Sequence, residues 1–157
     1  MANVTRLCPP FWGALLCVVS LVGCNGKEPT ENDMLGTWAV TDESRSILPA
    51  ESRQVRAKLT LKRNGEFVSD GVPPELLYSM PGMASAAPVS GTGTWKLGKV
   101  DGELALLLTY RAIDGPTEFK VPNGTRLLMD THPDETELYF FLGDPDQGKR
   151  VDFRKLK

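Results

Sequence analysis

The 157-residue sequence has one histidine, three cysteines and no excess of positive charge, and each shortage excludes a class of function. Zinc sites and histidine-based catalytic triads need imidazoles or thiolates that this chain can scarcely supply. With 18 basic and 20 acidic residues, and no aromatic residues interleaved among them, it lacks the features of a nucleic-acid-binding protein. The G-x-S-x-G motif of serine hydrolases is also missing. We therefore expect no enzyme activity, no nucleic-acid partner, no cofactor and no metal ion.

All three cysteines lie near the N-terminus, where Cys24 follows the one long apolar run of the chain. A short segment with one basic side chain and no acid precedes this run, which extends from about Leu7 to Leu21. A basic start, an apolar middle and small residues at the end are the parts of a secretory signal peptide. An uncleaved membrane anchor is the alternative, but a spanning helix needs about 20 apolar residues, and Pro9 and Pro10 shorten this one. A buried N-terminal helix is a further alternative.

The run closes on Leu21-Val22-Gly23-Cys24, which resembles the lipobox of bacterial lipoproteins. The resemblance implies that residues 1–23 are a signal peptide, that Cys24 carries the lipid, and that the protein is anchored in the bacterial cell envelope. An aspartate after the cysteine retains lipoproteins of enteric bacteria in the inner membrane. Because Asn25 stands there, the outer membrane, facing the periplasm, is favoured over the inner membrane. The mature chain then has no disulfide and must rely on a hydrophobic core.

Two regions follow the signal peptide. Residues 24–33 are polar, show no apolar period and predict a flexible tether. Residues 34–157 are numerous enough for one domain and too few for two.

Short strands joined by tight turns are predicted throughout residues 34–157. Val55–Lys62 alternates apolar and polar residues, and Asn64-Gly65 is a strong hairpin signal. Regular strands in short hairpins predict an all-β fold, an antiparallel up-and-down meander of eight or nine strands. We expect it to close into a small barrel, since open edges favour aggregation, with a two-sheet β-sandwich as the alternative. The other expected strands are 37–41, 66–68, 94–97, 103–110, 117–121, 126–130, 137–142 and 149–156.

Gly36-Thr37-Trp38 is similar to the G-x-W that opens the first strand of lipocalins. Residues 34–156 resemble, in strand order, the small lipocalin-like lipoproteins of bacteria, a largely uncharacterised family. The resemblance implies that Trp38 plugs the closed end of the barrel beneath an arginine from the last strand, for which Arg154 is the counterpart. It also implies that the barrel binds a small apolar or amphipathic ligand.

One connection, residues 69–91, is longer than a barrel needs, since loops beyond about 12–15 residues are uncommon. Pro73–Ser79 is able to form one helical turn, with proline in its first turn. The segment is interpreted as a lid over the barrel mouth, as a contact surface for another protein, or as filler packed on the barrel wall. Its candidate residues are Leu76, Leu77, Tyr78, Met80 and Met83.

Two polar turns resemble metal sites but fit hairpins better. Asp144–Gly148 starts like a calcium loop and then lacks the required ligands, and His132 lies in a turn-forming stretch without a second imidazole. The predicted inward residues are large and favour a filled barrel, which argues against a ligand inside. The strand Leu138–Leu142 is apolar on both faces. The alternative function is therefore a protein–protein contact module in the envelope, an inhibitor or an assembly accessory.

Overall fold

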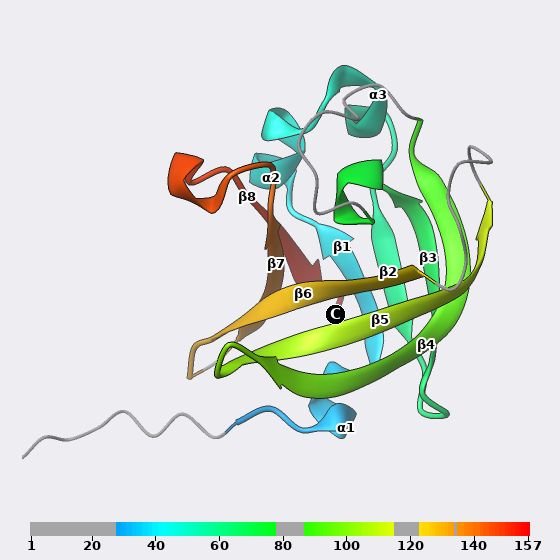
Figure 1. The fold of residues 1–157 in the computed structure, drawn as a ribbon, viewed down its shortest axis with the longest axis vertical. Coiled ribbons are helices and arrows are strands. Elements are labelled where there is room, and N and C mark those ends of the chain that lie inside the picture. Colours follow the sequence, from blue (N-terminus) through cyan, green and yellow to red (C-terminus); the bar gives the residue numbers. More distant parts are fainter. Residues whose placement is uncertain (1–27, 78–86, 115–122, 134) are drawn as a thin grey trace, which may run out of the picture.

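The computed structural model describes residues 28–77, 87–114, 123–133 and 135–157, which form a closed barrel of eight antiparallel strands (Figure 1). Each strand pairs with the next along the chain, and the last pairs with the first. This confirms the all-β, up-and-down barrel; the sandwich alternative is wrong, because the sheet has no open edge. The strands are β1 (Gly36–Val40), β2 (Lys58–Leu61), β3 (Glu66–Val72), β4 (Val89–Val100), β5 (Glu103–Asp114), β6 (Asn123–Thr131), β7 (Thr136–Phe141) and β8 (Arg150–Lys155).

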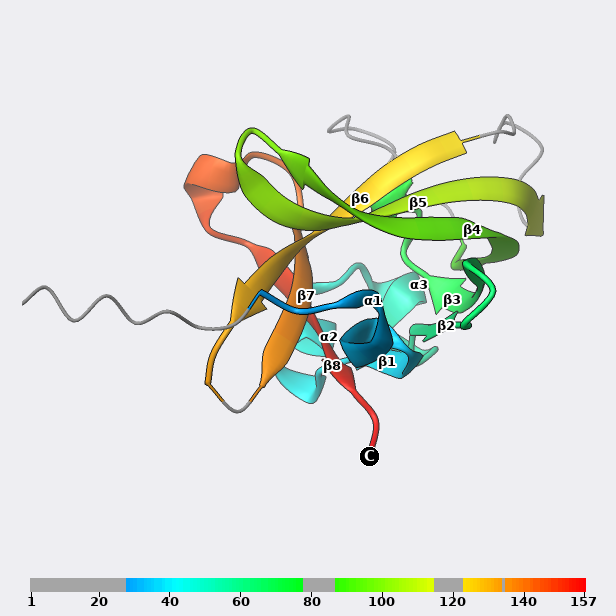
Figure 2. The same ribbon diagram turned by 90° about the horizontal axis from the view of Figure 1, so that it is seen from below.

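Short helices cover both ends of this barrel. The helix α1 (Glu31–Met34) lies across one end, and α2 (Asp42–Ile47) and α3 (Ala50–Arg53) lie at the other (Figures 1 and 2). Two 3-10 helices, η1 (Pro74–Leu76) and η2 (Pro145–Gln147), belong to the same end as α2 and α3. We call the α1 end the closed end and the opposite end the mouth.

Several boundaries differ from the sequence-based expectation. The segment between β1 and β2 contains α2 and α3, so the strand expected over 55–62 is reduced to β2. The helical turn expected within Pro73–Ser79 is present as η1, and the long connection is shorter than predicted because β3 reaches Val72 and β4 begins at Val89. The strand expected over 117–121 lies outside the described residues.

The helix α1 falls inside the segment predicted as a flexible tether, residues 24–33. A capping box explains why it forms: the hydroxyl and the backbone N–H of Thr30 both donate to the Asp33 carboxylate, at 2.6 and 2.8 Å. Met34, at its end, is fully buried in the core. Residues 31–33 of the predicted tether are therefore part of the folded domain.

Two lysines fasten this N-terminal segment to the closed end. The Nζ of Lys99 lies 2.8 Å from Oε1 of Glu28, and the Nζ of Lys155 donates to the carbonyl oxygen of Asp33 at 2.9 Å. The chain therefore enters the fold beside the closed end, on the side away from the mouth.

Large side chains fill the barrel interior. The rings of Phe67 and Tyr110 meet edge to face with centroids 4.8 Å apart, and the rings of Phe140 and Phe153 are 6.4 Å apart. The hydrophobic core extends from Met34 at the closed end to the residues of η1 at the mouth. Its largest fully buried members are Trp38, Tyr110, Phe67, Phe153, Met34, Leu48, Leu59, Leu106, Leu108, Leu127, Leu138 and Val40.

Candidate functional site

Trp38 lies at the closed end, where it is 1% exposed and its indole N–H donates to the carbonyl oxygen of Met34 at 2.9 Å. The cation at its ring is Lys155, with Nζ 6.0 Å from the ring centroid. Arg154 instead lies on the outer face, where its Nε donates to Oε1 of Glu137 at 2.6 Å. Trp38 pairs with Lys155 and Ala39 with Arg154, and neighbouring strand residues point to opposite faces. The structure therefore brings Lys155, rather than Arg154, to Trp38.

An ion-pair network surrounds Arg154 on the outer face of β6, β7 and β8. The Arg150 guanidinium lies 3.1 Å from Asp130 and 3.0 Å from Glu137, and it also pairs with Asp152. Burial lowers the pKa of Arg150, but the carboxylates of Asp152 and Asp130 outweigh it and raise the pKa above its ordinary value, so the guanidinium stays charged. Every charge in the network has a partner, which indicates a role in joining the strands.

The mouth of the barrel is plugged by η1. Leu76 and Leu77 are 4% and 5% exposed and belong to the core, and the hydroxyl of Thr125 donates to the carbonyl oxygen of Leu76. As described, these two leucines form a plug and no exposed contact surface. Tyr78, Met80 and Met83, the other residues of the predicted lid or contact surface, lie outside the described residues, as does Cys24.

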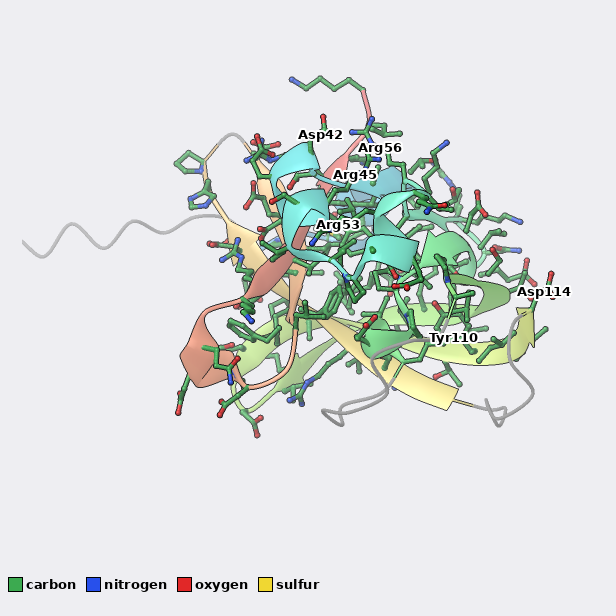
Figure 3. The ribbon with its side chains drawn as sticks, turned by 90° about the horizontal axis from the view of Figure 1, so that it is seen from above. Asp42, Arg45, Arg53, Arg56, Tyr110 and Asp114 are labelled. Atoms are coloured by element: carbon green, nitrogen blue, oxygen red, sulfur yellow. The ribbon has the colours of Figure 1, made fainter. Side chains whose placement is uncertain are left out.

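The helices α2 and α3 cover the mouth beside this plug (Figure 3). Thr41 caps α2 by accepting a hydrogen bond from the N–H of Ser44 at 3.2 Å. The guanidinium of Arg45 donates to the carbonyl oxygen of Arg53 at 2.9 Å and so ties α2 to α3. Tyr110 on β5 is fully buried, and its hydroxyl has no hydrogen-bond partner among the described residues. Burial raises its pKa to about 12, an effect that the nearby Ser69 hydroxyl partly offsets.

The barrel wall opens near the mouth, between β6 and β7. The ladder that joins these strands runs from Thr131 and Thr136 to Leu128 and Tyr139, and within the described residues no further pair follows. Their other neighbours stay paired beyond that point, β6 with β5 as far as Asn123 and β7 with β8 as far as Phe141. The two strands consequently diverge, as Figure 1 shows.

A cleft of about 210 Å³ lies where they diverge, and we call it the seam cleft. Two elements contribute to it besides the two strands: η1 enters from the mouth, and the residues around η2 form one rim. Most of its side chains are apolar, with one carboxylate, one hydroxyl and one guanidinium among them. It is lined by Glu75, Leu76, Thr125, Arg126, Leu128, Phe140, Phe141, Gly143 and Pro145.

The charged groups of the seam cleft have different surroundings. Arg126 is exposed and its Nη1 lies 4.0 Å from Oδ2 of Asp101, so its charge has an acidic neighbour. Oε2 of Glu75 is buried and has no hydrogen-bond partner among the described residues. Burial raises the pKa of the Glu75 carboxyl, a hydrogen bond from its own backbone opposes the rise, and the Glu51 carboxylate adds to it. Within the described part of the chain, one oxygen of Glu75 is thus left without a partner.

Glu75→Gln is expected to raise the melting temperature at pH 7. The pKa of Glu75 is higher in the folded than in the unfolded state, so its ionisation costs stability as the pH rises through the folded value. Well below pH 4.5, the ordinary pKa of a glutamate, the carboxyl is protonated in both the folded and the unfolded state, so the variant should have the melting temperature of the wild type. Differential scanning calorimetry at pH 7 and at a pH well below 4.5 measures the two melting temperatures. Glu103→Gln, at an exposed site, is the control. An equal melting temperature for wild type and Glu75→Gln at pH 7 contradicts it.

Sequence reasoning missed Glu75, Thr125 and Arg126 as site residues. The signal for Glu75 was its place in Pro-Pro-Glu-Leu-Leu, where a lone carboxylate is flanked by apolar residues that must be buried. The other two come from a strand, and nothing local distinguishes them from ordinary wall residues. Within the described residues, no group of three or more histidine, cysteine, aspartate or glutamate side chains is placed to hold a metal ion.

Comparison with known proteins adds no identification, because no family model, curated protein or solved structure matches this chain. Among the described residues, no helix has both the length and the apolar character needed to cross a membrane.

Proposed function

We propose that this protein is a non-catalytic envelope lipoprotein, anchored by lipid on Cys24, whose lipocalin-like barrel binds a small amphipathic molecule in the seam cleft. The observation that carries the proposal is the cleft itself. Its apolar side chains with a few convergent polar groups are the usual composition of a small-molecule site. No catalytic role is included, because among the described residues of the cleft the one hydroxyl, that of Thr125, donates to the carbonyl oxygen of Leu76 and not to a base.

The occupied interior explains why the ligand is assigned to the seam cleft. A small eight-stranded barrel has room for one modest ligand or for its own side chains. Here Trp38, Phe67, Tyr110 and Phe153 occupy the interior, and η1 plugs the mouth. A ligand inside the barrel would have to displace this core, whereas a ligand in the seam cleft would not.

The course of the N-terminus supports an orientation for the anchored protein. The chain reaches the closed end at Glu28, and only three residues separate Glu28 from Cys24. An extended chain advances at most about 3.6 Å per residue, so a lipid on Cys24 would hold the closed end within about 15 Å of the acylated cysteine. The mouth and the seam cleft, at the other end, would then face away from the membrane.

Tyr139 and Phe141 favour a second candidate, the protein-contact module. These outer residues of β7 meet edge to face with centroids 5.6 Å apart, and Phe141 lines the seam cleft. Aromatic residues are enriched where proteins bind one another. A photo-cross-linker at position 141 would trap one discrete envelope protein, and Tyr139→Ser would abolish that product.

Leu128→Trp is expected to weaken binding of a small amphipathic probe by at least about tenfold, because the indole would occupy the seam cleft. Leu128 is half-buried, so the larger side chain fits without entering the core. The probe is 2-phenylethanol, titrated calorimetrically into the full chain in phosphatidylcholine nanodiscs, with empty nanodiscs as the blank. Val68→Trp, at an exposed position outside the seam cleft, is the matched control and should bind like wild type. Absence of saturable binding, or equal binding by Leu128→Trp, contradicts the proposal.

A further inference from the structure

Glu75 is a lining residue of the seam cleft whose carboxylate the fold leaves partly unpaired. Within the described part of the chain, one of its oxygens is buried without a hydrogen bond, and no basic side chain forms an ion pair with the carboxylate. A buried carboxylate oxygen without a partner costs free energy. We propose that the seam cleft takes a hydrophobic ammonium compound, with its apolar body against the cleft walls and its charged nitrogen on the carboxylate of Glu75.

This inference rests on the proposed function and goes further by assigning the charge of the ligand. Glu75 on η1 has a second carboxylate, Glu51 of α3, near enough to raise its pKa further. Their mutual repulsion is relieved by a bound cation and worsened by a bound anion. Among the described residues that line the cleft, Arg126 is the one basic residue; it lies 4.0 Å from Asp101 and forms no ion pair with Glu75.

The walls of the seam cleft select an organic cation over a metal ion. Calcium takes six or more oxygen ligands and magnesium about six, whereas the cleft offers one carboxylate and one hydroxyl, from Thr125. Leu76, Leu128 and Phe140 instead offer apolar surface to a carbon skeleton. An ammonium group needs only a charge-assisted hydrogen bond, which is stronger than one between neutral groups.

Three compounds of the same shape and different charge test the proposal: 2-phenylethylamine, 2-phenylethanol and phenylacetate. Each is titrated at pH 7 into the full chain in phosphatidylcholine nanodiscs, whose lipid has no net charge, with empty nanodiscs as the blank. We expect the amine to bind at least about tenfold more tightly than the alcohol, and phenylacetate to bind more weakly than both. Equal affinity for amine and alcohol, or tighter binding of phenylacetate, overturns the proposal.

Glu75→Gln separates the charge of the site from its shape. The variant should bind the amine no more tightly than the alcohol. Glu103→Gln, at an exposed glutamate outside the cleft, should leave all three affinities unchanged, and melting curves of the same samples establish that the variants are folded. Amine binding that survives Glu75→Gln overturns the proposal. Binding of the alcohol without preference for the amine removes this inference alone, whereas failure of all three probes removes the proposed function as well.

Discussion

Trp38→Ala is expected to lower the free energy of unfolding by about 3–5 kcal/mol, the usual loss when a buried tryptophan or phenylalanine is truncated. The residue is 1% exposed and pairs across the sheet with the buried Leu59. Its indole N–H also satisfies the carbonyl oxygen of Met34 at the end of α1. Truncation would therefore leave a cavity at the closed end and remove a contact that holds the N-terminal helix on the barrel.

Urea unfolding followed by circular dichroism measures this loss, and two further variants divide it into parts. Trp38→Phe keeps an aromatic ring but loses the N–H donor, so its loss should be smaller than that of Trp38→Ala. Lys155→Met removes the cation 6.0 Å from the ring centroid together with its hydrogen bond to the carbonyl oxygen of Asp33, so its loss should be at most about 2 kcal/mol. A loss below about 1 kcal/mol for Trp38→Ala would contradict its role as the plug of the closed end.

The barrel was predictable because its signals are local and repeat along the chain. Alternating side chains indicate a strand with two different faces, and Asn64-Gly65 indicates the hairpin that joins β2 to β3. The pairing of β1 with β8 has no local signal. We expect it because the unpaired edge strands of a long apolar meander favour aggregation, and pairing the first strand with the last leaves no edge strand.

The helices between β1 and β2 have a weaker signal in the sequence than the strands have. Thr41 precedes Asp42 and Glu43, the arrangement of a helix N-cap followed by acidic residues in the first turn. The helix α2 has only six residues and α3 only four, so neither shows an apolar period that sequence reasoning detects. Burial of Leu48 and the hydrogen bond from Arg45 to Arg53 hold these turns in place, and both depend on the tertiary fold.

The lipocalin resemblance implies Arg154 at the closed end because it calls for an arginine in the last strand, whereas the structure has Lys155 there. A shift of one residue in a strand reverses the face of every side chain. The buried Val151 and Phe153 lie on the inward face of β8, and alternation places residue 155, rather than 154, on that same face. The pairing of Trp38 with Lys155 decides between the two.

The seam cleft was beyond sequence reasoning because it results from the point at which one strand ladder ends. The ladder between β6 and β7 ends at Leu128 and Tyr139, although β6 extends to Asn123 and β7 to Phe141. Strand boundaries are the least reliable part of a sequence-based assignment. A cleft that depends on where the ladder between two strands ends can be recognised only from a structure in which both strands have been placed.

Cys24→Ser is expected to abolish lipid attachment and to leave the barrel folded. Each buried methylene of an acyl chain contributes about 0.8 kcal/mol, and a single chain binds a membrane only marginally. The lipobox resemblance implies two or three chains on this one cysteine, enough to make release negligible. The serine variant would therefore be soluble or remain as uncleaved precursor. Its barrel should form regardless, because α1 and all eight strands are made by residues after Glu28.

Metabolic labelling with an alkyne fatty acid, followed by membrane fractionation, measures the effect. Cys17→Ser, which changes a cysteine inside the predicted signal peptide, is the matched control and should keep both the label and the membrane fraction. The circular dichroism spectrum of the Cys24→Ser protein should show the same β-sheet signal as that of the wild type. Label that persists in Cys24→Ser, or is absent from the wild type, would overturn the lipoprotein assignment. The seam cleft would be unaffected, because its lining residues, from Glu75 to Pro145, do not include the N-terminal anchor.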